Sequence, residues 1–244
     1  MTFSALLIAA GCGDDAFRRY DAAVLAIEDG RNTSALHDAT YASRHLSGIN
    51  RQRACYVAGL AAARLEKPQE ARRYLERASA STAPDVAGKA FVELGYLDRQ
   101  ENRQLQAAEN FESAANRLAP PDNGRAWLLA GEAYTKAGRT VDARRCLAMA
   151  QRQDNPNISN TAKSRIAHTG YTIQFGSYNS KTNATRRATE VTNLARGKGL
   201  GRARTPQLDG EWKVQLGTFS DRRQASQALK RLGRSDAFVV QIRS

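Results

Sequence analysis

Two short strings near the end of this 244-residue chain place a glutamine between apolar residues and ahead of a glycine. They read Ile-Gln-Phe-Gly-Ser-Tyr at 173–178 and Val-Gln-Leu-Gly-Thr-Phe at 214–219, 41 residues apart. The amides of Gln174 and Gln215 donate and accept hydrogen bonds at once, as the hydroxyl and N-acetyl groups of a sugar require. The chemistry that these residues offer is recognition of a polar ligand such as a carbohydrate.

Catalytic residues are not evident elsewhere in the sequence. The cysteines (Cys12, Cys55 and Cys146) lack the spacing of a metal site, and the three histidines form no cluster. No paired catalytic acids or nucleophile set is visible. We therefore predict a protein that is not an enzyme and uses no metal or other cofactor. Cys55 and Cys146 lie in helical patterns and are expected to be buried small residues.

Strands must position the two strings, because apolar and polar residues alternate through 171–178 and 211–219. Helices are expected at 180–197 and 220–233, a weaker strand at 203–208 and a last strand at 237–242. This order, β-α-β-β-α-β, predicts an α+β domain with two helices on one face of a sheet. The helix side would take Ile173, Phe175, Val214, Leu216, Phe238 and Val240. The open face would show Thr172, Gln174, Lys213, Gln215 and Gln241.

Positive charge is concentrated in the same part of the chain. The formal net charge is +13, and residues 160–244 hold 16 Lys/Arg against 5 Asp/Glu. The preceding residues are nearly neutral. This distribution indicates an anionic partner or setting for the C-terminal part, such as nucleic acid, an acidic polymer or a membrane surface.

The paired strings resemble the SPOR domain (the sporulation-related repeat), whose signature is two apolar-Gln-apolar-Gly-Ser/Pro-Phe strings, each ahead of a helix. Residues 220–225 are similar to the start of that family's second helix, and residues 232–240 to its ending. Tyr178, Lys213 and Thr218 depart from the commonest residues at their positions. The resemblance implies an RNP-like fold that binds peptidoglycan through the open sheet face, preferring glycan strands stripped of stem peptides.

Carried over by position, the resemblance also implies which residues meet the glycan. The implied contacts are Gln174, Ser177, Lys213 and Gln215. Tyr178 or Trp212 would offer a ring for sugar stacking, although strand alternation points Trp212 inward. The process served, whether division, sporulation or general wall maintenance, is left open.

RNA binding is the alternative function. The order β-α-β-β-α-β and the basic charge also suit an RNA-recognition module, which stacks bases on aromatic residues at the centre of its open sheet. Here those central places carry glutamine and lysine. The export signal described below also argues against contact with RNA.

Upstream, residues 16–156 repeat with a period of 36. The recurring columns are Gly59, Gly95 and Gly131; Ala71, Ala107 and Ala143; Leu75, Phe111 and Leu147; Ala78, Ala114 and Ala150; and Pro84, Pro120 and Pro156. Each copy predicts two helices that approach closely at glycine and alanine. One period earlier stand Ala26, Ala35 and Ala42, so residues 16–48 are expected to form a degenerate hairpin that caps the array.

The third copy resembles the tetratricopeptide repeat (TPR). Its Trp-Leu-Gly-Tyr-Ala-Phe-Ala-Pro columns are met by Trp127, Ala130, Gly131, Tyr134, Ala143, Leu147, Ala150 and Pro156. In the second copy, Asp98 stands where an aromatic residue is usual. The resemblance implies an all-α solenoid whose concave face binds a protein partner. The alternatives are a spacer, or a surface that packs against a second copy of the chain.

The first twelve residues form an apolar run that ends in Ala9-Ala10-Gly11-Cys12. This run resembles the lipobox of bacterial lipoprotein signal peptides, although it lacks a basic start and has Ala9 where Leu is commonest. The resemblance implies cleavage before Cys12, lipidation of Cys12 and a membrane-anchored periplasmic protein. Gly13 favours the outer membrane. An ordinary cleaved signal or a short apolar tail is the alternative. Twelve residues are too few to span a bilayer, so no transmembrane helix is predicted.

These patterns predict four parts. They are a signal peptide (1–12), a TPR-like helical domain (13–156), a polar, Asn-rich linker (157–168) and a SPOR domain (169–244).

Overall fold

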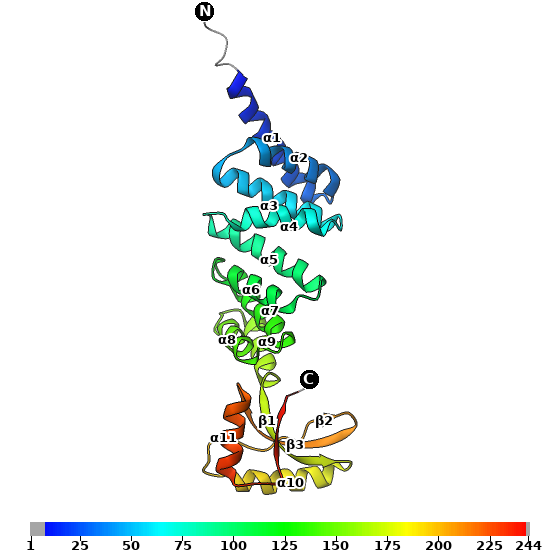
Figure 1. The fold of residues 1–244 in the computed structure, drawn as a ribbon, viewed down its shortest axis with the longest axis vertical. Helices are drawn as coiled ribbons and strands as arrows, with labels where there is room; N and C mark the ends of the chain where they lie inside the picture. The colour runs from blue at the N-terminus through cyan, green and yellow to red at the C-terminus, as the bar shows by residue number, and fades with distance from the viewer. Residues whose placement is uncertain (1–7, 243–244) are drawn as a thin grey trace, which may run out of the picture. The chain divides into compact units, whose positions relative to one another are not determined.

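The structure is a computed structural model that describes residues 8–242, with side chains from residue 14 onward. Residues 1–7 of the predicted signal peptide and the side chain of Cys12 therefore lie outside the described part of the chain. The chain forms two compact units, Met1–Ala133 and Tyr134–Ser244 (Figure 1). Within residues 8–242, no helix combines the length and the apolar character that crossing a membrane requires.

The first unit consists of consecutive helices joined by short turns. They are α1 (Ile8–Glu28), α2 (Asn32–His45), α3 (Gly48–Arg64), α4 (Pro68–Ser79), α5 (Pro84–Gln100), α6 (Gln104–Ala115) and the larger part of α7 (Asp122–Lys136). From α1 to α6, each helix packs against the next (Figure 1). The hairpin expected at 16–48 is α1 and α2, in which Ala26, Ala35 and Ala42 are buried as the spacing predicted.

Glycines in the repeat let paired helices come close together. A Cβ atom added at Gly59 would lie 2.6 Å from the Leu75 side chain, and one added at Gly95 would lie 2.6 Å from the Phe111 ring. These two contacts are one 36-residue period apart, so α5 meets α6 as α3 meets α4. Across these two hairpins, the repeat in the sequence is a repeat in the packing.

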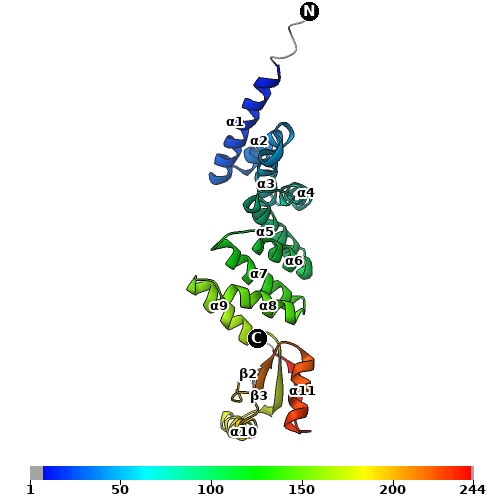
Figure 2. The ribbon, with the colours of Figure 1, turned by 90° about the vertical axis from the view of Figure 1, so that its left-hand side faces the viewer.

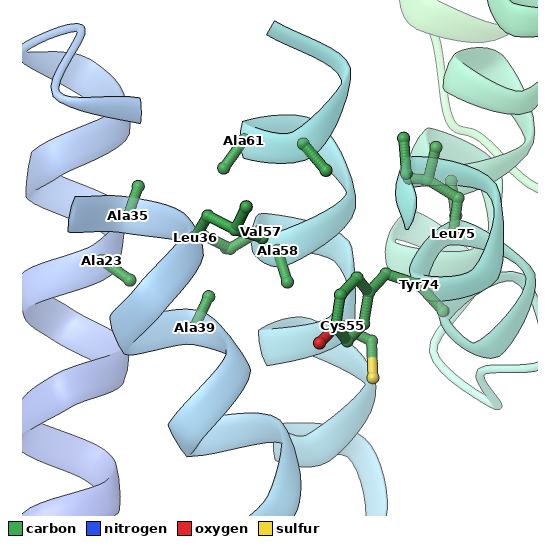
Figure 3. Packing of buried hydrophobic residues seen from close by; sticks show 14 of the residues in the cluster. Ala23, Ala35, Leu36, Ala39, Cys55, Val57, Ala58, Ala61, Tyr74 and Leu75 are labelled. Atoms are coloured by element: carbon green, nitrogen blue, oxygen red, sulfur yellow. The ribbon is translucent and has the colours of Figure 1, made fainter. Parts of the chain in front are cut away.

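Alanine dominates the core of the first unit. Figure 3 shows Leu36 of α2 beside Val57 and Ala58 of α3, with small side chains filling the space around them. Cys55 is buried in the same cluster, as predicted. Tyr74 also belongs to the cluster, and its hydroxyl lies 3.0 Å from Thr40 Oγ1. Small residues at these positions permit short distances between helix axes.

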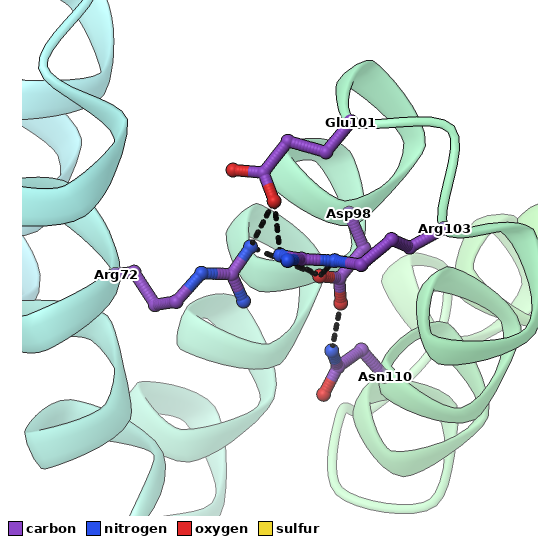
Figure 4. Close-up of polar contacts among 5 residues, drawn as sticks. All are labelled: Arg72, Asp98, Glu101, Arg103 and Asn110. Atoms are coloured by element: carbon purple, nitrogen blue, oxygen red, sulfur yellow. Dashed lines mark hydrogen bonds and ion pairs between the residues drawn. The ribbon is translucent and has the colours of Figure 1, made fainter.

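One charged group is buried among these helices. Asp98 of α5, at the place where the tetratricopeptide repeat usually has an aromatic residue, is only 2% exposed. Its carboxylate accepts hydrogen bonds from Arg72 of α4 (2.9 Å), Arg103 (2.8 Å) and Asn110 of α6 (2.6 Å), as Figure 4 shows. Glu101 pairs with both arginines. This Asp98 cluster joins three successive helices through charge-assisted hydrogen bonds.

The second unit adds helices and a sheet. Its further elements are α8 (Thr140–Gln151), α9 (Pro156–Ala167), β1 (Tyr171–Tyr178), α10 (Lys181–Leu194), β2 (Gln207–Leu208), β3 (Glu211–Phe219), α11 (Arg222–Leu232) and β4 (Phe238–Gln241). The sheet has the order β2-β3-β1-β4, with antiparallel neighbours. Both α10 and α11 contact β1 and β3, and Figure 2 shows α11 running alongside the strands. The predicted order of elements, β-α-β-β-α-β, is confirmed.

The sheet side that was expected to hold the helices does so over its two central strands. Ile173, Phe175, Val214 and Leu216 are buried in one cluster with alanines of α10 and α11. The edge strand β4 differs from the prediction. Its register pairs Val239 with Ile173, so Phe238 and Val240 lie on the open face and Gln241 lies on the helix side. The sequence 237–241 is apolar on both alternations, and the pattern therefore could not decide the face.

The polar stretch expected to be a linker is helical. Asn155 caps α9, and its side chain accepts hydrogen bonds from the backbone of Asn157 and Ile158. Pro156 occupies the first turn, where its missing N–H is no loss. Ile158 and Ala162 are buried, and α9 packs on α8. Asn155-Pro156 therefore starts a helix here, whereas the sequence predicted that it ends the helical array.

An arginine of α8 forms hydrogen bonds with the segment that leads from α9 into β1. Arg144 Nη1 donates to the carbonyl oxygens of Ile166 (2.9 Å) and Thr169 (2.7 Å). Burial lowers the pKa of Arg144. Gly170 follows, and its carbonyl accepts a hydrogen bond from Ile242 N. Arg144 thus joins α8 to the end of α9 and to the turn that leads into β1.

Candidate functional site

The two glutamines of the paired strings meet on one face of the sheet. Gln174 of β1 lies directly opposite Gln215 of β3, and Ser177 lies opposite Lys213. Residues directly opposite each other in an antiparallel pair point to the same face. Gln174, Ser177, Lys213 and Gln215, which the sequence grouped as ligand contacts, therefore share the side of the sheet opposite the helices.

Bulges at the two string glycines produce this arrangement. Pairing shifts by one residue between Gln174 and Ser177 on β1, and again near Gly217 on β3. Gly176 has a φ of +130° and Gly217 a φ of +71°, conformations that favour glycine. Because one extra residue reverses the alternation, Gln174 and Ser177 share a face although they are three residues apart. The glycines thus determine which side chains face outward.

A single row of side chains crosses the whole sheet at the glutamine pair. Arg204, just before β2, forms a bridge with Gln215, and Phe238 of β4 lies opposite Gln174. The order across the open face is therefore Arg204, Gln215, Gln174 and Phe238. We call these four residues the transverse row. Its two ends, a guanidinium and an aromatic ring, were not among the predicted site residues.

Next to the transverse row, Lys213 forms a short polar chain. Its Nζ donates to Ser177 Oγ at 3.0 Å and forms an ion pair with Glu211. Gln174 Nε2 lies 3.5 Å from the same serine oxygen. The charge of Lys213 is thus balanced within the site, and Ser177 is the exposed member of the chain. This part of the face offers hydroxyl and amide groups to a polar ligand.

Two residues expected to be exposed on the open face are buried. Gln215 is 3% exposed and Thr172 is fully buried. Thr172 Oγ1 bonds to the carbonyl oxygens of Leu216 (3.1 Å) and Gly217 (2.8 Å), so it stabilises the β3 bulge. Gln215 sits between Arg204 and Gln174 in the transverse row. Counting alternation gave the correct face for both residues but did not reveal this crowding.

Aromatic rings lie elsewhere than expected. Tyr178 and Trp212 are opposite each other, and both pack against the core on the helix side. Lys181 Nζ lies 5.2 Å from the centroid of the Trp212 ring. The inward direction anticipated for Trp212 is confirmed, and Tyr178 joins it. The exposed ring of the open face is Phe238, at 53%.

The first unit contains a separate hollow of about 260 Å³. It is lined by Tyr56 of α3, Glu93 and Tyr96 of α5, and Leu129 of α7. Burial raises the pKa of Glu93 and raises the pKa of Tyr56 to about 12. The hollow is thus lined by α3, α5 and α7, the first helices of three successive hairpins, and it presents both polar and apolar groups.

The C-terminal part of the chain is a two-layer α+β domain whose open sheet face presents polar side chains. Residues 167–241 match the profile of the SPOR domain. This part of the chain is therefore a SPOR domain, a peptidoglycan-binding rather than catalytic domain. No curated protein matches the chain.

Proposed function

We propose that this protein is a non-catalytic component of the bacterial cell envelope that binds glycan strands of peptidoglycan, preferring those without stem peptides. The observation that carries the proposal is the match of residues 167–241 to the SPOR domain, together with the register that puts Gln174 and Ser177 on one face. Amide and hydroxyl groups suit the hydroxyl and N-acetyl groups of amino sugars.

The geometry revises the roles of the contact residues within this proposal. Gln174, Ser177 and Lys213 are the polar contacts, since none of them is fully buried. Gln215 acts beneath them as a positioning residue. Phe238 takes the place of Tyr178 and Trp212 as the ring against which a sugar packs.

Binding to purified wall material tests this proposal. The full-length protein is mixed with native sacculi and with sacculi whose stem peptides have been removed, and the bound fraction is measured. Replacing Gln174 and Ser177 together by alanine is expected to weaken binding by about tenfold, because two hydrogen bonds are lost. Gln227→Ala, on the exposed face of α11, is the matched control. Equal binding by the unaltered protein, the double variant and the control would refute the assignment of this face as the glycan-binding face. Single-stranded RNA is the competing ligand, and an affinity for it that falls steeply with salt would favour the RNA alternative.

The helical array is proposed to hold a protein partner, in the manner of TPR proteins. Its support is the 36-residue repeat of paired helices and the hollow lined by Tyr56 and Tyr96. A photoreactive amino acid placed at Tyr96 should cross-link the partner in cells. The same group at Glu76, exposed on α4, should not. Identical products from both positions would contradict a role for the hollow.

Anchoring through Cys12 is proposed on the lipobox-like sequence alone. Mass spectrometry of the mature N-terminus should then find a diacylated or triacylated cysteine, and Cys12→Ser should release the protein from the membrane fraction. An unmodified N-terminus that begins after a different cleavage site would indicate an ordinary signal peptide.

A further inference from the structure

Arg204 stands out among the basic residues of the SPOR domain by its position. Its backbone N–H donates to Gln215 O at 2.7 Å, and Gln215 N–H donates to Arg204 O at 2.9 Å. This reciprocal pair puts the Arg204 side chain on the same sheet face as Gln215. The guanidinium therefore forms one end of the transverse row, next to the proposed glycan contacts.

The guanidinium lacks an acceptor for part of its hydrogen-bonding capacity. Arg204 Nη2 is buried and makes no hydrogen bond to any residue that the structure describes. Burial alone lowers the pKa of Arg204, and no carboxylate offsets it. By contrast, Lys213 on the same face pairs with Glu211. A buried donor without an acceptor is unfavourable, and an acceptor brought by a ligand would remove that penalty.

The ligand of the proposed function carries a suitable acceptor. In peptidoglycan, the stem peptide is joined by an amide bond to the lactyl carboxyl group of N-acetylmuramic acid. Hydrolysis of that amide leaves a free carboxylate, so a stripped strand carries one negative charge per disaccharide. Guanidinium groups bind carboxylates through two parallel, charge-assisted hydrogen bonds. The Arg204 side chain is only half-buried, so a turn of the guanidinium that exposes Nη2 would let a carboxylate reach it from solvent.

We infer that Arg204 binds the lactyl carboxylate of stripped glycan strands and so selects them over strands that bear stem peptides. The inference rests on the proposed function. It assigns to this arginine a task that the amides of the row cannot perform, because an amide group does not distinguish a carboxylate from its amide by charge.

Two soluble ligands separate charge recognition from glycan binding. One is a stripped glycan oligomer with free carboxylates, and the other is the same oligomer after conversion of the carboxylates to neutral methylamides. The full-length protein is expected to bind the first about tenfold or more tightly than the second. Arg204→Gln should weaken binding to the carboxylate form by a similar factor and so abolish the preference for it over the methylamide form. Arg202→Gln, an exposed arginine two residues away, removes the same charge and should keep the preference.

Several outcomes would overturn the inference. One is equal binding of both ligands by the unaltered protein, a comparison that does not depend on the folding of any variant. Another is an undiminished preference in a folded Arg204→Gln protein. A third is an equal loss of the preference in Arg202→Gln, which would show that the preference comes from the overall positive charge and not from Arg204. Failure of the unaltered protein to bind either ligand is different, because it would refute the proposed function itself.

Discussion

Replacing Asp98 by alanine tests whether a buried ion cluster stabilises the helical array. The substitution removes the common acceptor of Arg72, Arg103 and Asn110. It also leaves an empty space beside α6. The array should remain helical, because the alanine-rich core is untouched, but its free energy of unfolding should fall.

The size of the loss follows from the exposure of the arginines. Removing one partner from a fully buried ion pair typically costs about 3–5 kcal/mol, because the other charge is left without compensation. Here the Arg72 and Arg103 side chains are 24% and 43% exposed, and both keep Glu101 as a partner. Water and Glu101 therefore take over part of the interaction. We expect a loss of about 2 kcal/mol, a large share of the stability of an ordinary domain.

Tryptophan fluorescence during urea unfolding provides the measurement. The chain has two tryptophans, Trp127 in α7 and Trp212 in β3. In a Trp212→Phe background, the signal comes from Trp127, which is buried in the first unit. Glu101→Ala is the control and should cost less than about 1 kcal/mol, because this carboxylate is one-third exposed. An Asp98→Ala protein within about 0.5 kcal/mol of its parent, or a control with an equal loss, would refute the reasoning.

Three further outcomes can be checked with similar experiments. Gly217→Ala should lower the melting temperature of the SPOR domain more than Gly210→Ala does; both positions have positive φ, but only at Gly217 would the added Cβ meet a side chain, the Phe219 ring at 2.7 Å. Glu93→Gln should raise the urea midpoint at pH 7 and have no effect below a pH of about 4. Burial raises the pKa of Glu93 in the folded state, so its ionisation destabilises the fold only as pH rises past the pKa that Glu93 has in the unfolded chain. A difference in midpoint that is the same at both pH values would contradict this assignment. Phe238→Ser should weaken binding to stripped sacculi severalfold without lowering the melting temperature, since the ring is largely exposed; unchanged binding would remove the ring from the site.

The central strands of the SPOR domain could be predicted because their sequence constrains them twice. Alternation in 171–178 and 211–219 indicated strands, and the two matching strings indicated that they are related halves. The face of Gln174 and Gln215 followed correctly. The burial of Gln215 did not, because it depends on Arg204, whose segment contains Pro206 and showed only a weak strand pattern.

Other features depend on contacts that a single segment does not reveal. The face of Phe238 was predicted incorrectly because its strand is apolar on both sides, and only pairing with Gln174 decides the matter. The helix α9 was missed because Asn155-Pro156 suits both a chain break and a helix start. In the first unit, the 36-residue spacing of small residues was enough to predict the paired helices. A glycine that recurs with a large residue one helix later indicates that the two helices pack closely.

The position of β1 has a mechanical consequence. This strand receives the chain from α9, lies between β3 and β4, and is hydrogen-bonded on both edges. Tension that enters along β1 while the open face is held would load both ladders in shear, so many hydrogen bonds would have to break together. An edge strand pulled from its side would instead peel away one bond at a time. Arg144 of α8 binds the carbonyl oxygens of Ile166 and Thr169, just before β1, so the chain would also be held at the point where such tension enters the domain.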